Sequence, residues 1–394
     1  MQDSTRPFLV LYIVWHPGFA RGKALADALR EHFRRKLFEN VSGGVGISVI
    51  FRFAEMQGSE APLPIDLNEA ETTAIAVLAD SNLVEDAAWT KYVKELAELT
   101  EAAGLGKRMF PIAMEKNVLG ALGLEEQALR WDQWQGSEEE LRRRLTNELT
   151  YELCRVLRHH LERLKHPAED DAALEAYVKK VQIFLSHSKH DDDGVRIALA
   201  IRERLNGGHG LSSFFDVHDI PAGLRFHRVL LNAVRVSAMV AIHTNSYSSR
   251  EWCRREVIEA KRWNVPLVIA NSISDKDERG FPYMGNVPVI RLEPSSMDRI
   301  DVVVGLLLDE VLKDFLWRCR VEIVRDTKDA TTFFLPRPPE LISLAILPPI
   351  SEVSDPIIVY PDPPLSAEEE RLFAQIAPRV QLRSFTEWIA GAVR

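Results

Sequence analysis

The feature that most constrains the fold is an alternation of short apolar runs with helix-like stretches, which occurs twice along the chain. The run 8–15, FLVLYIVW, is continuously apolar and rich in β-branched and aromatic residues, like strands that are buried on both faces. The next stretch, 18–38, carries apolar residues at the spacing of a helix. Strands that alternate with helices predict parallel sheets covered on both faces. We therefore expect an α/β fold with flavodoxin-like, doubly wound sheets in two tandem domains.

The first alternation occupies residues 1–135 and predicts one α/β domain. Its further elements are strands at 46–53, 73–80 and 109–114 and a helix near 86–103. A long helix should follow from about Ser137 to Lys165, because leucines recur every four residues and Ser137 and Glu140 have the spacing of a capping box. A polar stretch then ends this helix, so we expect residues 136–178 to connect two domains.

The alternation restarts near residue 179 and predicts a second α/β domain over 179–325. Its elements are strands at 181–186, 212–216, 237–244 and 266–271 and helices at 194–205, 223–235, 298–319 and around Glu256. We interpret them as the βα units of a flavodoxin-like sheet. The rest of the chain, 326–394, is rich in proline and contains a βαβ-like piece. Its elements are strands at 356–361 and 380–385 around a helix at 366–376. That piece is too short to stand alone as a domain.

Composition limits the class of protein. Of the 394 residues, 46% are hydrophobic and 27% are charged, which is typical of soluble globular proteins, and the net charge of −9 argues against a general nucleic-acid-binding surface. No apolar run approaches the roughly 20 residues that span a bilayer, and the N-terminus lacks the pattern of a signal peptide. Three cysteines without metal-site spacing indicate a reducing compartment and no disulfide framework. We therefore expect a cytoplasmic protein without a membrane partner.

The two alternations contain a pair of similar segments, 74–99 and 238–263. Each consists of a predicted strand, a polar turn and a helix that begins at a tryptophan. Four residues after Trp252 stands Glu256, whereas Val93 stands at the corresponding position of the first segment. If the similarity reflects a repeat, the first copy has lost a carboxylate. The alternative is that any two βα units look alike.

Three pieces of the second alternation, taken in order, resemble the Toll/interleukin-1 receptor (TIR) domain family over about residues 178–320. They are 183-IFLSHSKHD-191, the stretch 215–247 and 248-SSREWCRRE-256. The last piece matches the Ser-x-x-Trp-Cys-x-x-Glu pattern that opens a helix of the family. The N-terminal domain resembles the family only in its order of strands and helices, so we expect either a degenerate copy or an unrelated α/β domain.

The resemblance implies a function for the second domain. Many bacterial and plant members of the family cleave NAD⁺ at the nicotinamide–ribose bond or cyclise the product, whereas other members are only adaptors. The resemblance implies that Glu256 is catalytic and that assembly through the loop after the second strand completes the pocket. The residues expected to bind substrate are Phe184, Ser186, His187, Ser188, Asn245, Trp252 and Arg225. Those expected in the interaction loop are Asp219, Pro221 and Gly223.

The doubly wound topology predicts the same place independently of the resemblance. In a sheet with strand order 2-1-3-4-5, a ligand lies in the crevice outside the carboxyl ends of strands 1 and 3. Here those ends are 185–188 and 242–246, and the second leads directly to Glu256. Nicotinamide leaves NAD⁺ as a neutral molecule, so a carboxylate that stabilises the charge developing on the ribose is sufficient. Trp252, one helical turn before Glu256, shares its predicted helix face and could stack on a planar ring.

Each of these residues also has a purely structural interpretation. A glutamate near the start of a helix is favoured by the helix dipole alone, and Trp252 could equally anchor the core. Cys253 has no histidine or metal partner at helical spacing and is best interpreted as a small buried hydrophobic residue. The stretch 187–193, HSKHDDD, is more typical of a solvated turn than of a metal site, and no glycine-rich stretch has the spacing of a phosphate loop. We therefore expect no metal and no cofactor, with NAD⁺ as the substrate.

Two functions of different classes follow. The first is an NAD⁺ hydrolase or cyclase that is switched on by homo-oligomerisation and serves bacteria as an anti-phage or stress effector. The alternative is a catalytically silent TIR scaffold that acts through protein–protein contacts, with the N-terminal domain as the sensor of a partner or small signal. A flavin or nucleotide-sugar binder is a weaker interpretation, because no phosphate loop is present in the sequence. The sequence decides neither the product, the trigger nor the oligomeric state, nor the role of residues 330–394.

Overall fold

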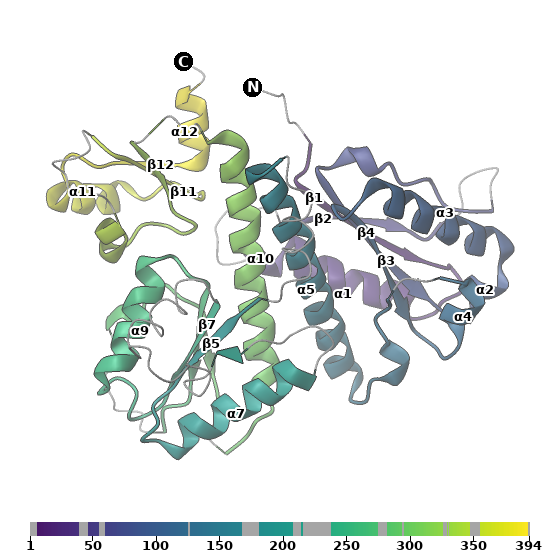
Figure 1. Cartoon of the computed structure of the whole chain (residues 1–394), viewed down its shortest axis with the longest axis horizontal. Coiled ribbons are helices and arrows are strands. Elements are labelled where there is room, and N and C mark those ends of the chain that lie inside the picture. The colour runs from purple at the N-terminus through teal and green to yellow at the C-terminus, as the bar shows by residue number, and fades with distance from the viewer. Residues whose placement is uncertain are drawn as a thin grey trace. The chain divides into compact units, whose positions relative to one another are not determined.

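The chain forms two compact units, Met1–Val178 and Lys179–Arg394 (Figure 1). The computed structural model describes residues 6–38, 46–54, 60–124, 127–167, 181–207, 214–215, 238–274, 282–293, 295–325, 329, 331–346 and 355–392. Each unit is an α/β structure built on parallel sheets, as the alternation of apolar runs and helical stretches predicts.

A four-stranded parallel sheet forms the centre of the first unit. Its strands, in the order β2-β1-β3-β4, are Ser48–Arg52, Leu9–Trp15, Thr72–Ala79 and Lys107–Ala113. Strands β1 and β3 are buried along their whole length, which agrees with their continuously apolar sequences. The register sets Val10 opposite Ser48 on one side and opposite Thr73 on the other. The helices that follow the strands are α1 (Gly22–Arg34), α2 (Ser81–Glu85), α3 (Ala87–Ala103) and α4 (Val118–Leu122).

The long helix α5 runs from Glu138 to Lys165 and belongs to the first unit. At its start, the Ser137 hydroxyl accepts a hydrogen bond from the backbone N–H of Glu140 at 3.3 Å. The Glu140 carboxylate accepts one from the backbone N–H of Ser137 at 2.7 Å. This reciprocal capping box satisfies donors that the helix itself leaves unpaired. The predicted helix and its cap are confirmed, and α5 packs on β3 and α1.

A five-stranded parallel sheet forms the centre of the second unit, with the strand order β6-β5-β7-β8-β9. Its strands are β5 (Ile183–Ser186), β6 (Phe214–Phe215), β7 (Ala238–His243), β8 (Leu267–Asn271) and β9 (Val289–Arg291). In chain order this is 2-1-3-4-5, so the flavodoxin-like topology is confirmed. The helices are α7 (Asp192–Gly207), α9 (Glu251–Arg262) and α10 (Ile300–Val324). Figure 1 shows α9 and α10 on opposite sides of β5 and β7. The helix expected at 223–235 lies outside the described residues.

The strand β9 has no counterpart among the sequence-based predictions. It consists of three residues, of which Ile290 is buried while Val289 and Arg291 are exposed. A segment this short offers too few positions for an apolar alternation to be recognised. Its pairing with β8 places it at the edge of the sheet.

The C-terminal part of the second unit carries a three-stranded parallel sheet of its own. Its elements are β10 (Thr332–Phe334), β11 (Ile357–Tyr360), β12 (Gln381–Ser384), α11 (Ala367–Ile376) and α12 (Phe385–Ala392). The order β11-α11-β12 confirms the expected βαβ-like piece. Among the described residues, a small buried cluster of this sheet consists of Leu335, Ile358 and Tyr360, with a few half-buried neighbours. Further contact comes from α10, where the rings of Trp317 and Phe385 lie 5.3 Å apart.

A buried ion pair joins the segment that precedes α11 to helix α9. The Lys261 ammonium group donates to both carboxylate oxygens of Glu340, at 2.6 and 2.9 Å, and to the carbonyl oxygen of Gly285 at 2.6 Å. The side chain of Lys261 is 5% exposed and that of Glu340 is 30% exposed. A cation buried to this degree is stable only when partners replace its hydration shell. The contact therefore holds the end of α9 against the C-terminal segment.

We predict that Glu340→Gln lowers the free energy of unfolding by roughly 3 kcal/mol, because it leaves the charge of Lys261 buried without its counter-ion. Lys261→Met should cost less, since an apolar side chain of similar length fills the same space and needs no partner. Denaturant unfolding of the two variants and the wild type measures both effects. Equal losses for the two variants would contradict this interpretation of the ion pair.

Candidate functional site

The carboxyl ends of β5 and β7 lie side by side at the centre of the five-stranded sheet. The two strands pair from Ile183–Ala238 to Ser186–Ala241. Here the strand order reverses, with β5 continuing toward α7 and β7 toward α9. Doubly wound sheets bind their ligands at this point. The candidate site is therefore built from the residues that follow these two strands and from the first turns of α9.

Glu256 lies in the second turn of α9, and its side chain is directed into the protein. It is 7% exposed, and the hydroxyl of Ser186 donates a hydrogen bond to Glu256 Oε2 at 2.5 Å. Side chains alternate between the two faces of a strand. Ser186 therefore projects from the same face of β5 as Phe184, which belongs to the core beneath α9. The apolar pattern of β5 thus places one hydroxyl at the border of that core.

Tyr247 extends this contact to a row of three polar groups. It lies in the turn between β7 and α9, its side chain is fully buried, and its hydroxyl oxygen is 2.5 Å from Ser186 Oγ. Two backbone hydrogen bonds of 3.0 Å fix the turn, one from Tyr247 N–H to the Thr244 carbonyl and one from Arg250 N–H to the Tyr247 carbonyl. Tyr247, Ser186 and Glu256 therefore lie in one hydrogen-bonded row inside the protein.

Burial dominates the electrostatics of this row. It raises the pKa of Glu256 from the ordinary 4.5 to about 7, and the hydrogen bond from Ser186 acts in the opposite direction. Burial also raises the pKa of Tyr247 well above its ordinary value and that of Cys253 to about 12, so both groups stay protonated at neutral pH. Glu256 is therefore the group of this set that changes its charge near neutral pH. Such a group can act as an electrostatic or acid–base catalyst.

A second polar cluster ties the loop after β5 to the loop after β7. Ser246 Oγ lies 2.8 Å from Ser188 Oγ and 3.2 Å from Asp191 Oδ2. Asp191 also accepts the backbone N–H groups of Asp193 at 3.1 Å and of Gly194 at 3.4 Å. Burial raises the pKa of Asp191, but its hydrogen bonds outweigh burial and keep the pKa below the ordinary value. The hydroxyl of Ser188, expected to bind substrate, is thus engaged inside the protein.

The remaining expected substrate-binding residues lie in different surroundings. Phe184 is 3% exposed within the core, and His187 is half-buried. Asn245 is exposed and pairs with Ser274, beyond β8, through hydrogen bonds of 2.6 and 3.0 Å. Arg225 and the interaction-loop residues Asp219, Pro221 and Gly223 lie outside the described residues. Of the expected set, the structure brings Ser186 into contact with Glu256.

Trp252 lies one helical turn before Glu256 but in a different environment. Its side chain is 41% exposed, and the guanidinium carbon of Arg255 lies 5.0 Å from the centroid of its ring. The interpretation of Trp252 as a core anchor is therefore wrong. The ring is partly exposed in the first turn of α9, whereas Glu256 is directed toward the sheet.

Sequence reasoning singled out neither Tyr247 nor Asp191. The local signal for Tyr247 is weak, because an aromatic residue in a polar turn after a strand has many structural roles. Its contact with Ser186 joins residues 61 positions apart, and this proximity follows from the pairing of β5 with β7. Asp191 stands in the stretch 187–193, which the sequence predicts to be a solvated turn, and its carboxylate instead organises the start of α7.

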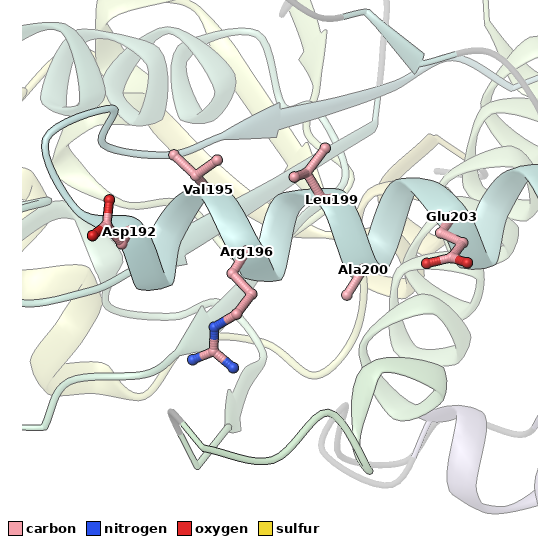
Figure 2. Close-up of a pocket in the computed structure, with 6 residues that line it drawn as sticks. All are labelled: Asp192, Val195, Arg196, Leu199, Ala200 and Glu203. Atoms are coloured by element: carbon pink, nitrogen blue, oxygen red, sulfur yellow. The ribbon is translucent and has the colours of Figure 1, made fainter.

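A hollow of about 390 Å³ lies along α7 (Figure 2). Its lining residues are Asp192, Val195, Arg196, Leu199, Ala200 and Glu203. Figure 2 shows that they project from successive turns of this one helix. None of the residues expected to bind substrate lines it, so this hollow is distinct from the place where Ser186 meets Glu256.

Among the residues that the structure describes, no group of three or more His, Cys, Asp or Glu side chains is arranged to hold a metal ion. No helix within the described ranges combines the length and the apolar character needed to cross a membrane.

In the first unit an apolar side chain, Val93, stands four residues after Trp89, as Glu256 stands four residues after Trp252. Val93 is fully buried in the core of that unit, together with Trp89. The loops after β1 and β3 also lie against each other. Gly18 N–H donates to His16 Nδ1 at 3.0 Å, and a Cβ atom at Gly18 would come within 3.1 Å of Asn82 Oδ1. Because Val93 is apolar, the candidate carboxylate has no counterpart four residues after Trp89.

Comparisons with known proteins bear on the second unit. A family model described as TIR domain matches residues 183–295, a range that contains Ser186, Tyr247 and Glu256. No curated protein matches the chain.

Two solved structures are similar to the chain at a low level. One is the C-terminal domain of glucosamine-fructose-6-phosphate aminotransferase from Francisella tularensis, with 14% identity over 81% of this chain and 85% of that chain and a TM-score of 0.19. The other is tagatose-6-phosphate ketose/aldose isomerase from Escherichia coli, with 12% identity over 79% of this chain and 83% of that chain and a TM-score of 0.21. Similarity at these TM-scores carries no inference about the chain.

We predict that Glu256→Gln stabilises the second unit and that the gain grows with pH. The folded-state pKa of about 7 lies above the ordinary 4.5. The folded state therefore binds more protons than the unfolded state between these values, and it loses stability as the pH rises from 4.5 to about 7. The uncharged amide avoids this loss, which is of the order of 3 kcal/mol.

Unfolding transitions at about pH 5 and about pH 8 measure the effect. Glu251→Gln, an exposed position on the same helix, is the control and should differ from the wild type equally at both pH values. If the gap between Glu256→Gln and the wild type does not widen toward pH 8, Glu256 is not desolvated in the folded protein.

Proposed function

Because residues 183–295 form a TIR domain, we propose that this chain cleaves NAD⁺ at the nicotinamide–ribose bond with Glu256 as the catalytic carboxylate. The observation that carries the proposal is the position of Glu256. It is a buried carboxylate at the carboxyl ends of the two central strands, held by Ser186 at 2.5 Å. Topology alone makes that place the ligand-binding point of a doubly wound sheet.

The chemistry of this bond cleavage suits a single carboxylate. Nicotinamide is bound in NAD⁺ as a positively charged pyridinium ring, so it takes the bonding electron pair and departs as a neutral molecule without an added proton. Positive charge then develops on the ribose, as in glycoside hydrolysis. An ionised carboxylate in surroundings of low dielectric stabilises that charge more strongly than one in water. Water then adds to the ribose carbon and releases a proton, or a nucleophile elsewhere in the same molecule adds to that carbon and closes a ring.

Substrate contacts are the next part of the proposal. We infer that the nicotinamide end lies near Glu256 and that the expected residues of the two loops hold the rest of the dinucleotide. Trp252 supports this inference with a ring that is 41% exposed one helical turn before Glu256, because exposed aromatic rings stack on planar heterocycles. His187 is half-buried directly after Ser186 and lies at the border between the core and the solvent.

Self-association is a further part of the proposal. In the single chain Glu256 is 7% exposed, so a dinucleotide reaches it only after the surroundings rearrange. We infer that contacts between the TIR domains of neighbouring copies favour the open arrangement, with the first unit receiving the activating signal. Consumption of NAD⁺ would deprive a bacterial cell of a central cofactor, which fits an anti-phage or stress effector.

A catalytically silent scaffold is the second candidate function. The low exposure of Glu256 also fits a residue that serves only the interior of the domain. The exposed pair of Trp252 and Arg255 consists of residue types that are enriched where proteins bind one another. Under this alternative, the chain would act through contacts on the surface of α9.

We predict that concentrated protein releases nicotinamide from NAD⁺ and that Glu256→Gln reduces the rate about 10²–10³-fold, a loss common when one electrostatic group is removed. Chromatography of the reaction mixture measures the release. Glu251→Gln on the same helix should keep the wild-type rate. Equal rates for wild type and Glu256→Gln would place the catalytic group elsewhere, and no release at any concentration would favour the scaffold.

We also predict that the specific activity rises with protein concentration, because the open site forms in the assembled state. Rates per chain over a dilution series, with sedimentation of the same samples, measure this dependence. Constant specific activity in a sample shown to be monomeric would exclude activation by self-association. It would leave the cleavage of NAD⁺ itself untouched.

A further inference from the structure

The row formed by Tyr247, Ser186 and Glu256 contains a hydroxyl that the proposed chemistry does not use. Tyr247 is fully buried and Ser186 is 1% exposed, so water does not supply their hydrogen bonds. The Tyr247 hydroxyl lies 2.5 Å from Ser186 Oγ, and Ser186 Oγ lies 2.5 Å from Glu256 Oε2. Leaving such a buried hydroxyl unpaired would be costly. Tyr247 therefore requires Ser186, its hydrogen-bond partner among the described residues.

The protons in this row have one arrangement when Glu256 is ionised. A carboxylate only accepts hydrogen bonds, so Ser186 must donate its single hydroxyl proton to Glu256 Oε2. Ser186 can then only accept from Tyr247, which donates. Burial raises the pKa of Tyr247 well above its ordinary value, and the phenol therefore keeps the proton that it donates. A hydroxyl that accepts one hydrogen bond becomes a stronger donor in the next.

The ring of Tyr247 is held in place from several sides. It packs with Phe184, Cys253 and Val257 in the core beneath α9. The ring centroid of His243 lies 5.8 Å from that of Tyr247, and His243 Nε2 is 2.8 Å from Ser248 Oγ. Since an aromatic side chain has few rotatable bonds, this packing fixes the direction of its hydroxyl. The geometry of Ser186 is thereby fixed as well.

Among the described residues, the titratable groups that interact with Glu256 are neutral at neutral pH. They are Tyr247 in the turn after β7 and Cys253 on α9 itself, while Ser186, which faces Glu256 from β5, does not titrate in this range. Cys253 is protonated because burial raises its pKa to about 12. His243, next to Tyr247, has a pKa that burial lowers, so it is uncharged at neutral pH. The charge of Arg250 lowers the pKa of Cys253. The pKa of Glu256 is raised by burial and lowered by the hydrogen bond from Ser186.

We propose that Tyr247 is a positioning residue that orients Ser186 as the donor to Glu256 Oε2, so that the other carboxylate oxygen, Oε1, is presented to the ribose of the substrate. This inference rests on the proposed cleavage of NAD⁺ and names the residues that prepare the carboxylate. Tyr247 touches neither substrate nor reacting atoms. It acts through Ser186, and removal of its hydroxyl weakens the hydrogen bond that favours the ionised carboxylate.

The test compares Tyr247→Phe with Ser186→Ala, the double variant and the wild type. Difference infrared spectroscopy follows the ionisation of the Glu256 carboxyl group as the pH is raised, with Glu256→Gln as the blank. This readout needs no activity. We expect Tyr247→Phe to move the titration upward by about 0.5–1 pH unit and Ser186→Ala to move it further. The double variant should match Ser186→Ala, because Tyr247 acts only through Ser186.

Kinetics supply the second readout. The rate of nicotinamide release should rise with pH as Glu256 ionises. In Tyr247→Phe this rise should move to higher pH, with kcat reduced about 3- to 10-fold at neutral pH, restored at alkaline pH, and KM unchanged. Tyr360→Phe is the matched control. Tyr360 is also fully buried, and its hydroxyl accepts the backbone N–H of Leu365 at 2.9 Å in the small C-terminal sheet. This control should leave both readouts at wild-type values.

The outcomes separate this inference from the proposed function. A shifted titration without nicotinamide release from any protein supports the positioning role and counts against NAD⁺ cleavage. If the protein releases nicotinamide but the Glu256 carboxyl group of Tyr247→Phe titrates as in the wild type, the positioning role is overturned and the cleavage of NAD⁺ stands. Additive effects of the two single substitutions also overturn it. Should Tyr247→Phe not fold, Ser186→Thr decides: it retains the hydroxyl, so it should titrate as the wild type does, and a shift equal to that of Ser186→Ala would refute the proposal.

Discussion

The burial of one carboxylate among apolar side chains is the constraint on which the candidate site depends. Phe184, Met239 and Val257 pack β5, β7 and α9 together, and the same contacts exclude water from Glu256. Exclusion of water raises the pKa of Glu256 to about 7 and would destabilise the domain whenever the group ionises. The hydrogen bond from Ser186 offsets part of that cost. Fold and electrostatics are thus joined, because the packing that stabilises the sheet also raises the pKa of Glu256.

The two units show that a shared topology does not carry the site with it. The first sheet has the order β2-β1-β3-β4, which equals the first four positions of the second sheet. In the first unit, however, Val93 and Trp89 simply complete an apolar core. In the second, Glu256 stands four residues after Trp252, whose side chain is 41% exposed. A carboxylate at this position needs a hydroxyl on the facing strand, and Ser186 at the end of β5 supplies it. The proposed function therefore depends on these few side chains rather than on the α/β scaffold.

Sequence reasoning succeeds where a strand is buried on both faces, as for β1, β3 and β7, because such strands are continuously apolar. It misses β9 and β10, whose three residues at a sheet edge carry no recognisable pattern. Topology and family resemblance locate Glu256 at the ends of the central strands. They do not reveal Tyr247, since its contact with Ser186 depends on the register between β5 and β7. Helical spacing also predicts that Trp252 and Glu256 share one face of the helix. In the structure Trp252 is partly exposed and Glu256 is buried, because the first turn of α9 extends beyond the core that the second turn contacts.

Helix α9 is held at both ends, and this determines how much of the chain the site requires. At its start, the turn that contains Tyr247 joins it to β7. At its end, Lys261 is bound by Glu340 and by the carbonyl oxygen of Gly285. A helix of this length moves as a stiff rod, so a shift of either end changes the distance between Glu256 and Ser186. Glu340 lies beyond residues 183–295, the range that matches the TIR domain model. A fragment cut at residue 295 would leave the buried charge of Lys261 without its counter-ion and would loosen the helix that carries Glu256. The C-terminal segment is therefore part of the framework of the site, although it contributes no side chain to the row of Tyr247, Ser186 and Glu256.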